Sequence, residues 1–295
     1  MKTITTNTIM NSILNSISSE YALDPNSKST GFQSLDNVIG GWKIGVSVIS
    51  ARPSMGLTAF ALNQVSQQLA SLKENEVVIY VADKESSTAL MHRMLSIASQ
   101  IDLSIIQNGK LNKEEYEKVK SHPLTRQLKD NKVVFLNTNT PTVYAIRNLV
   151  HSLKKEGNKV SMVIVDSLQS MVDRVRFRNQ DAEQVMLDLN LLSEEYEFPV
   201  LCTMPLGRSI EFRDSKYPRL TDLDAKMVNV ASSVMFLLRP DYYELFDAAD
   251  DNVSEMHLII AKNEGPLDTL SLGMNRKNLS ITEAKLNSLM NNTNL

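Results

Sequence analysis

The sequence predicts an α/β protein with a mostly parallel central sheet that is covered by helices on both faces. Short, continuous apolar runs such as VSVIS at residues 46–50 and VVIYV at residues 77–81 are typical of strands that are buried on both faces. Stretches with apolar residues at helical spacing separate these runs. An alternation of strands and helices of this kind predicts parallel strand pairing.

The predicted elements follow one another from residue 46 onwards. The first strand leads into a helix that carries Phe60, Leu62, Val65 and Leu69. Further strands are predicted at residues 77–81, 133–136, 162–165, 199–202, 234–237 and 256–260, and further helices at residues 87–100, 143–153 and 183–196. No internal repeat interrupts this order, which indicates one large domain.

Two terminal segments are expected outside this domain. Residues 1–22 carry Ile9, Ile13, Ile17 and Tyr21 at a four-residue spacing that fits one face of a short helix, and the DPNS run that follows ends it. Such a helix would bury its face on a neighbouring copy, but a partly disordered tail fits the segment equally well. We expect a linker segment at residues 1–28, the domain at residues 29–280 and a flexible, Asn-rich tail at residues 281–295.

The composition restricts the class of protein. The chain has 295 residues, of which 42% are apolar and 22% charged, as in globular proteins with a sizeable core. No run of eighteen apolar residues and no secretory signal occur, so we expect a cytoplasmic protein without a membrane span. Cys202 is the only cysteine, which excludes an internal disulfide and a cysteine-based zinc site. The net charge of −3 argues against strong autonomous binding to DNA.

A candidate phosphate loop, SARPSMGLT at residues 50–58, lies between a predicted strand and a predicted helix. In a P-loop, backbone N–H groups and a helix N-terminus bind phosphates, a lysine bonds the β- and γ-phosphates, and a Ser or Thr hydroxyl holds Mg²⁺. Thr58 stands at the hydroxyl position, but Leu57 occupies the position of the lysine. Asp166 follows a buried strand, where P-loop enzymes place the carboxylate that organises Mg²⁺.

Several ordered segments of the chain resemble the DnaB family of replicative DNA helicases over about residues 29–275. The resemblance implies a RecA-like P-loop ATPase fold that binds ATP and Mg²⁺ and forms a homo-oligomeric ring. The family's N-terminal collar domain has no counterpart, and residues 1–28 resemble only its linker helix. The matching segments are TGFQSLD at residues 30–36, GG at 40–41, ARPSMGLTAFALN at 51–63, VDSLQSM at 165–171, RSIEFRDSKYPRLTDL at 208–223, VMFLLRPDYY at 234–243 and AKNEGP at 261–266.

The resemblance also implies which residues would bind the ligands. The metal ligands would be Thr58 and Asp166. The nucleotide would be bound by Pro53, Ser54, Met55, Gly56, Thr58, Lys84, Arg239 and Lys262.

The chain departs from the family at the residues that carry the chemistry. Leu57 is the first of these departures. The second is Lys84, which aligns with the glutamate that acts as general base in the family. Glu85 could replace that glutamate only if the end of the strand shifts. Pro205, after Met204, stands where the family has a glutamine that senses the γ-phosphate, and Glu264 stands near the place of the arginine finger. Loss of an arginine finger alone can cost roughly 10³–10⁵ in rate, and loss of a general base about 10²–10⁴.

Contacts with DNA are also expected to be weakened. The family's phosphate-gripping loop reads Asp224-Ala225-Lys226-Met227, with a carboxylate in place of an arginine. Lys226 remains a candidate DNA contact, as does the basic run of Arg174, Arg176 and Arg178, for which a solvated loop is the alternative.

These departures predict a degenerate ATPase domain that serves as a structural or regulatory subunit, with itself or an active DnaB-type helicase as partner. The alternatives are an active hexameric ATP-dependent DNA helicase that uses variant residues, and a nucleotide-binding switch without a DNA role. Leu57 removes the positive charge of the P-loop lysine, and Lys84 introduces a positive charge nearby. It could partly replace the missing lysine, or it could be a solvated lysine at a strand end.

Overall fold

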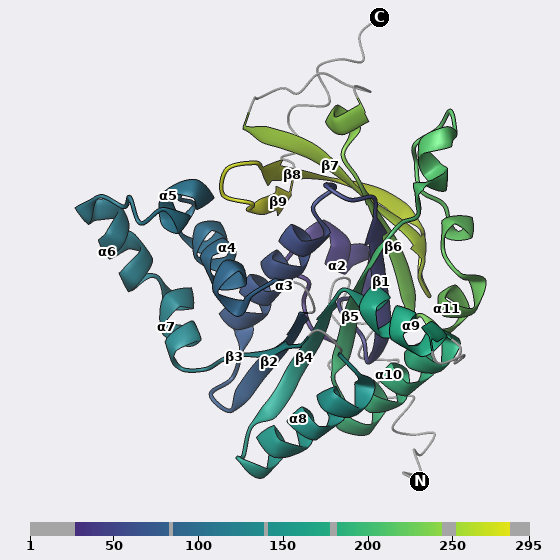
Figure 1. Ribbon diagram of the computed structural model, residues 1–295, viewed down its shortest axis with the longest axis horizontal. Helices are drawn as coiled ribbons and strands as arrows, with labels where there is room; N and C mark the ends of the chain where they lie inside the picture. Colours follow the sequence, from purple (N-terminus) through teal and green to yellow (C-terminus); the bar gives the residue numbers. More distant parts are fainter. Residues whose placement is uncertain (1–26, 83–84, 139–140, 178–181, 244–251, 284–295) are drawn as a thin grey trace, which may run out of the picture.

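The computed structural model describes residues 27–82, 85–138, 141–177, 182–243 and 252–283. The expected linker helix within residues 1–22, Lys84, Arg178 and the tail from residue 284 onwards lie outside the described residues. Figure 1 shows one sheet that crosses the molecule, with helices on either side of it. The predicted class, a mostly parallel sheet with helices on both faces, is confirmed.

The sheet has nine strands among the described residues, in the spatial order β3-β2-β4-β5-β1-β6-β7-β8-β9. The first six in this order pair in parallel, and β7, β8 and β9 extend the sheet by antiparallel pairing. The strands are β1 (Gly45–Ala51), β2 (Glu76–Ala82), β3 (Val133–Asn137), β4 (Lys159–Asp166), β5 (Pro199–Pro205), β6 (Ser233–Leu238), β7 (Val253–Lys262), β8 (Asp268–Asn275) and β9 (Ile281–Glu283).

Two apolar cores cover the two faces of the sheet. Side chains alternate along each strand, so Ile49 of β1 joins one core and Val48 joins the other. The helices α2 (Gln33–Ile39), α3 (Leu57–Ser71), α4 (Ser87–Ser99) and α7 (Pro123–Lys129) contribute to the first core. The helices α8 (Val143–Lys155), α9 (Leu168–Phe177), α10 (Ala182–Tyr196) and α11 (Ala225–Val230) contribute to the second core.

The segment between α4 and β3 holds helices that the sequence reasoning missed. They are α5 (Leu103–Gln107), α6 (Lys113–Ser121) and α7. Helix α6 has no buried residue, so it lacks the apolar periodicity on which the prediction relied. Its local signal is a capping box, in which Asn112 and Glu115 each accept a hydrogen bond from the other's backbone N–H.

Both ends of the folded domain extend beyond the expected bounds of 29 and 280. Lys28 forms a β-bridge with Trp42 and an ion pair with the buried Glu76. At the other end, β9 pairs with β8, and Ile281 is buried in the first core. Among the described residues, no helix has the length and apolarity needed to cross a membrane.

Candidate nucleotide-binding site

The candidate site lies where neighbouring parallel strands end at one edge of the sheet. Ala82 at the end of β2 pairs with Asp166 at the end of β4, and Ala51 at the end of β1 pairs with Pro205 at the end of β5. In open α/β sheets, ligands bind outside the carboxyl ends of the strands, because the loops there surround a crevice. The phosphate loop leaves β1 at this edge and leads directly into α3.

The phosphate loop has the backbone shape that its glycine requires. Gly56 has a φ of +96°, a conformation that L side chains rarely adopt, and precedes the first residue of the fifteen-residue helix α3. A Cβ atom at Gly56 would lie 3.0 Å from both Met256 Cε and Met274 Sδ. The first N–H groups of an α-helix have no acceptor within the helix, so the N-terminus of α3, which follows this loop, favours an anion.

Two arginines hold the phosphate loop in place. Arg239 Nη1 donates a 3.2 Å hydrogen bond to the carbonyl of Ser54, and Arg239 N lies 3.4 Å from Met55 Sδ. Arg52 donates through Nη1 to the carbonyl of Leu206 and forms an ion pair through Nε with Glu211, each at 2.7 Å. These contacts join the loop to the segments that follow β5 and β6.

The carboxylate of Asp166 accepts a hydrogen bond on each of its oxygens. Tyr80 of β2 donates to Oδ2 at 2.7 Å, and Thr203 of β5 donates to Oδ1 at 2.6 Å. Burial, and then the neighbouring Asp166 carboxylate, raise the pKa of the Tyr80 hydroxyl well above its usual value, so it stays a neutral donor. Asp166 is thus fixed by the strands on both sides of β4.

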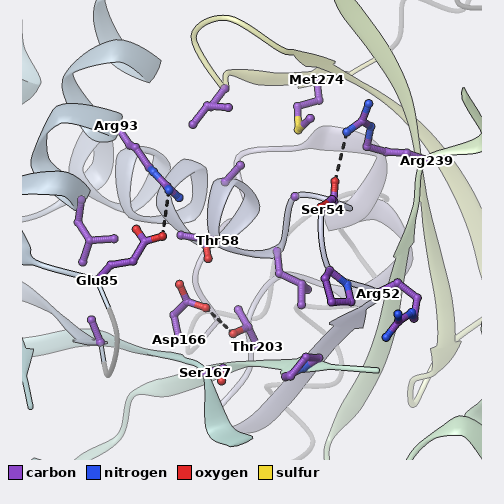
Figure 2. A pocket seen from close by; sticks show the side chains of 18 of the residues that line it. Arg52, Ser54, Thr58, Glu85, Arg93, Asp166, Ser167, Thr203, Arg239 and Met274 are labelled. Carbon is purple, nitrogen blue, oxygen red and sulfur yellow. Dashed lines mark hydrogen bonds and ion pairs between the residues drawn. The ribbon is translucent and has the colours of Figure 1, made fainter. Parts of the chain in front are cut away.

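These elements line a cavity of about 670 Å³, a size that accommodates a small-molecule ligand. Figure 2 shows Thr58 and Asp166 near the centre of the view, with Arg93 and Glu85 on one side and Arg239 on the other. Its apolar wall consists of Leu90, Leu103, Met274 and Leu279. Four arginines line it, and each one already has a carboxylate partner: Arg52 with Glu211, Arg93 with Glu85, and both Arg239 and Arg276 with Asp241.

Most of the residues predicted for the site, including two of its degenerate positions, line this one cavity. They are Pro53, Ser54, Gly56, Leu57, Thr58, Asp166, Pro205 and Arg239. Met55 differs, because its side chain is 1% exposed and packs in the first core, which leaves only its backbone for a ligand.

Lys262 and Glu264 lie elsewhere in the fold. The ammonium of Lys262 donates to the carbonyls of Val228, Asn229 and Ala231 at the C-terminal end of α11, and burial lowers its pKa. Glu264 is exposed and forms a 2.9 Å ion pair with Lys43. Neither residue lines the cavity of its own chain.

The candidate DNA contacts are only partly described. Lys226 lies 3.6 Å from Glu183 in an exposed ion pair, and Asp224 accepts a hydrogen bond from its backbone N–H as the N-cap of α11. The carboxylate at position 224 therefore has a local structural role. Arg174 and Arg176 belong to α9, but their side chains lie outside the described structure.

Sequence reasoning missed several residues of the site, among them Tyr80, Arg93, Thr203 and Arg276. Tyr80 and Thr203 are polar residues within otherwise apolar strand runs, and a buried hydroxyl needs a hydrogen-bond partner. That signal was available in the sequence, although it does not identify the partner. Arg276 follows β8, a strand that the sequence pattern did not predict.

The donor groups of the cavity fit a magnesium–nucleotide complex in part. Among the described residues, no group of three or more His, Cys, Asp or Glu side chains could hold a metal alone. Mg²⁺ in nucleotide sites needs only one or two protein oxygens, because phosphates and water supply the others. Thr58 and Asp166 meet that requirement and both line the cavity, whereas no described lysine lines it.

Comparison with known proteins agrees with this architecture. The sequence model for the DnaB-like helicase C terminal domain matches residues 28–283. The chain is 32% identical over 252 residues to a replicative DNA helicase DnaB of Geobacillus stearothermophilus, which covers 82% of this chain and 53% of that protein. It is 31% identical over 251 residues to a probable replicative DNA helicase of Trieres chinensis, which covers 83% of this chain and 54% of that protein.

Solved structures show the same fold. The ATPase domain of G40P superposes with a TM-score of 0.80 at 23% identity, covering 96% of this chain and all of that chain. A DnaB-like replicative helicase, described with its interactions with primase, gives a TM-score of 0.79 at 23% identity and covers 97% of this chain and 68% of that one. The chain spans about half the length of the curated relatives it matches.

Proposed function

This chain belongs to the DnaB-like helicase C-terminal domain family, and from that premise we propose that it is a structural or regulatory subunit with a degenerate ATPase site. It assembles with copies of itself, or with an active DnaB-type helicase, through the surfaces that the family fold retains. Its pocket binds a nucleotide but does not hydrolyse it quickly. Its role lies in DNA replication, as the names of its relatives suggest.

The single observation that supports this proposal most strongly is the position of Leu57. It is the first residue of α3 and lines the cavity, where a working P-loop has its lysine. Its side chain is partly buried against the first core and carries no charge. Position 57 therefore lacks the lysine that bonds the β- and γ-phosphates in a working P-loop.

At Pro205, at the same edge of the sheet, the chain lacks a second functional group, the glutamine that the family has at this position. It ends β5 beside Ala51 and lines the cavity, yet proline has neither a backbone N–H nor a polar side chain. It cannot donate a hydrogen bond to a phosphate or to an attacking water. Loss of several such groups together leaves little beyond background hydrolysis.

Binding without turnover is supported by the parts that remain. Gly56 and the N-terminus of α3 keep the geometry of a phosphate site, and Thr58 and Asp166 would hold Mg²⁺. When bound, Mg²⁺ would neutralise part of the phosphate charge. The apolar wall around Leu103 and Leu279 offers room for a nucleobase.

The test is a calorimetric titration of ATP and ADP with Mg²⁺, with hydrolysis measured on the same sample with and without single-stranded DNA. We expect binding without turnover, and weaker binding for Thr58→Ala. Thr282→Ala, outside the cavity, is the matched control and should bind as the parent does. Hydrolysis that single-stranded DNA stimulates would overturn the proposal.

The second candidate function is an active ATP-dependent DNA helicase. It is favoured by one observation, the presence of both expected Mg²⁺ ligands, Thr58 and Asp166, in one cavity. The hydrolysis assay separates the two candidates directly, because only an active helicase couples turnover to DNA.

A further inference from the structure

Arg93 and Glu85 form an ion pair that lies inside the candidate nucleotide cavity. Arg93 Nη2 lies 2.9 Å from Glu85 Oε1, and both residues line the cavity together with Thr58 and Asp166. Figure 2 shows the two side chains pointing toward one another beside Thr58. The other carboxylate oxygen of Glu85, Oε2, is buried and has no hydrogen-bond partner among the described residues.

This pair is the most easily opened of the arginine pairs around the cavity. Asp241 is 8% exposed and is held by Arg239, Arg276 and Ser254 together. Glu211 accepts hydrogen bonds from both Arg52 and Tyr243, and Arg52 also binds the Leu206 carbonyl.

In contrast, the ion pair with Arg93 is the only polar contact of the Glu85 side chain among the described residues. The Glu85 side chain is 36% exposed. A partly exposed ion pair adds little net stability, because water solvates both groups once they separate. Arg93, which is 28% exposed, projects into the cavity from α4, a helix whose end is anchored independently by the Ser86 N-cap. Because α4 does not depend on this ion pair for its N-cap, opening the pair would leave the backbone that carries Arg93 in place.

We propose that Glu85 is an internal counter-ion that occupies Arg93 in place of a phosphate, and that a bound polyphosphate displaces Glu85 and takes over the guanidinium. The inference rests on the proposed nucleotide-binding function of this cavity. Arg93 then supplies the phosphate-binding charge that Leu57 does not, and Glu85 sets how readily that charge becomes available. A guanidinium binds a phosphate as it binds a carboxylate, through two parallel N–H groups, so one can replace the other without moving the arginine.

The proposal predicts opposite effects for the two partners. Glu85→Gln removes the competing charge and should tighten the binding of inorganic tripolyphosphate and of Mg²⁺–ADP by about threefold to tenfold. Arg93→Gln should weaken both by about tenfold or more, since a charge-assisted hydrogen bond to phosphate is lost. Arg93→Lys keeps the charge without the two-pronged geometry and should fall between the parent and Arg93→Gln.

The double variant decides how Glu85 acts. If Glu85 works through Arg93, then Glu85→Gln has no further effect in the Arg93→Gln background, and the two changes are strongly non-additive. An equal gain in both backgrounds would mean that Glu85 merely repels anions, and the proposal would be wrong. The experiment is a calorimetric titration of the full chain, with circular dichroism to show that each variant is folded.

The control pair is Arg147 and Glu195, an ion pair between α8 and α10 that does not line the cavity. Arg147→Gln and Glu195→Gln should leave both affinities unchanged. Unchanged affinity for Glu85→Gln, or no binding of either ligand to parent and Glu85→Gln alike, would overturn the proposal. Rapid ATP hydrolysis would overturn the proposed function. It would not affect the present proposal, which is tested by the relative affinities of the parent and the variants.

Discussion

The hydroxyl of Tyr80 donates a 2.7 Å hydrogen bond to the carboxylate of Asp166, the expected Mg²⁺ ligand at the end of β4. Tyr80 is fully buried on β2, and Thr203 of β5 holds the other carboxylate oxygen. Asp166 is thus part of a cross-strand network that ties three neighbouring strand ends together. It contributes to the stability of the fold as well as to the site.

Replacing Tyr80 by phenylalanine should lower the free energy of unfolding by about 1.5 kcal/mol, the low end for a hydrogen bond to a charged group. The low end applies because Asp166 keeps the hydrogen bond from Thr203 and also faces the cavity, where water can bind it. Urea denaturation measures the change. Tyr116→Phe, at an exposed tyrosine of α6, is the control and should have no measurable effect. Equal stability of parent and Tyr80→Phe would show that the hydrogen bond contributes nothing.

Replacing Leu57 by lysine should tighten nucleotide binding without restoring fast hydrolysis. An ammonium at the first turn of α3 would contact the β- and γ-phosphates, and a charge-assisted hydrogen bond of about 1.5–3 kcal/mol corresponds to roughly a tenfold or greater gain in affinity. Pro205 still provides no donor, so the rate should stay close to background. Titration of ATP and a phosphate-release assay measure the two effects. Leu57→Met separates the charge from the change in shape, and a high turnover rate in Leu57→Lys would contradict the expectation.

Replacing Gly56 by alanine should destabilise the phosphate loop. The left-handed backbone costs an L residue about 1–2 kcal/mol, and the new Cβ would press against Met256 and Met274 at 3.0 Å. The flexible ends of those methionines can yield, so the total loss should be about 1–3 kcal/mol. Gly207→Ala is the matched control, because its φ is −63° and a Cβ there meets open space. Urea unfolding of both variants gives the comparison, and similar losses would argue against local strain at Gly56.

Replacing Asp241 by asparagine should cost about 3 kcal/mol at neutral pH, because it leaves Arg239 and Arg276 without their shared carboxylate. Burial would raise the pKa of Asp241, but hydrogen bonds from Arg239 and Ser254 outweigh it and lower the pKa. A lowered pKa means that the stabilisation is complete above the unfolded value of about 3.9 and is lost as the pH falls through the folded pKa. The difference in unfolding free energy between parent and Asp241→Asn should therefore shrink between about pH 5 and pH 2. Urea unfolding across that range tests it, and a difference that stays constant would exclude ionisation of Asp241 as the cause.

The sequence by itself predicted seven of the nine described strands and the place of the candidate site. Strands that are buried on both faces have continuous apolar runs. These runs predicted β1 to β7, because the pattern does not depend on which strand lies next to it in the sheet. The phosphate loop and Asp166 were also recognised, because each depends on a local pattern at the end of a strand. Helix α6, which buries no residue, left no such pattern.

Only the tertiary structure decided which side chains meet in the cavity. Tyr80, Asp166 and Thr203 are separated by 86 and 37 residues in the chain, and the register of β2, β4 and β5 brings them together. The same holds for two of the ion pairs of the cavity arginines: Arg52 and Glu211 are 159 residues apart, and Arg276 and Asp241 are 35 residues apart. A local pattern specifies how a segment folds, but hydrogen bonds and ion pairs between distant segments depend on strand order, which no single segment encodes.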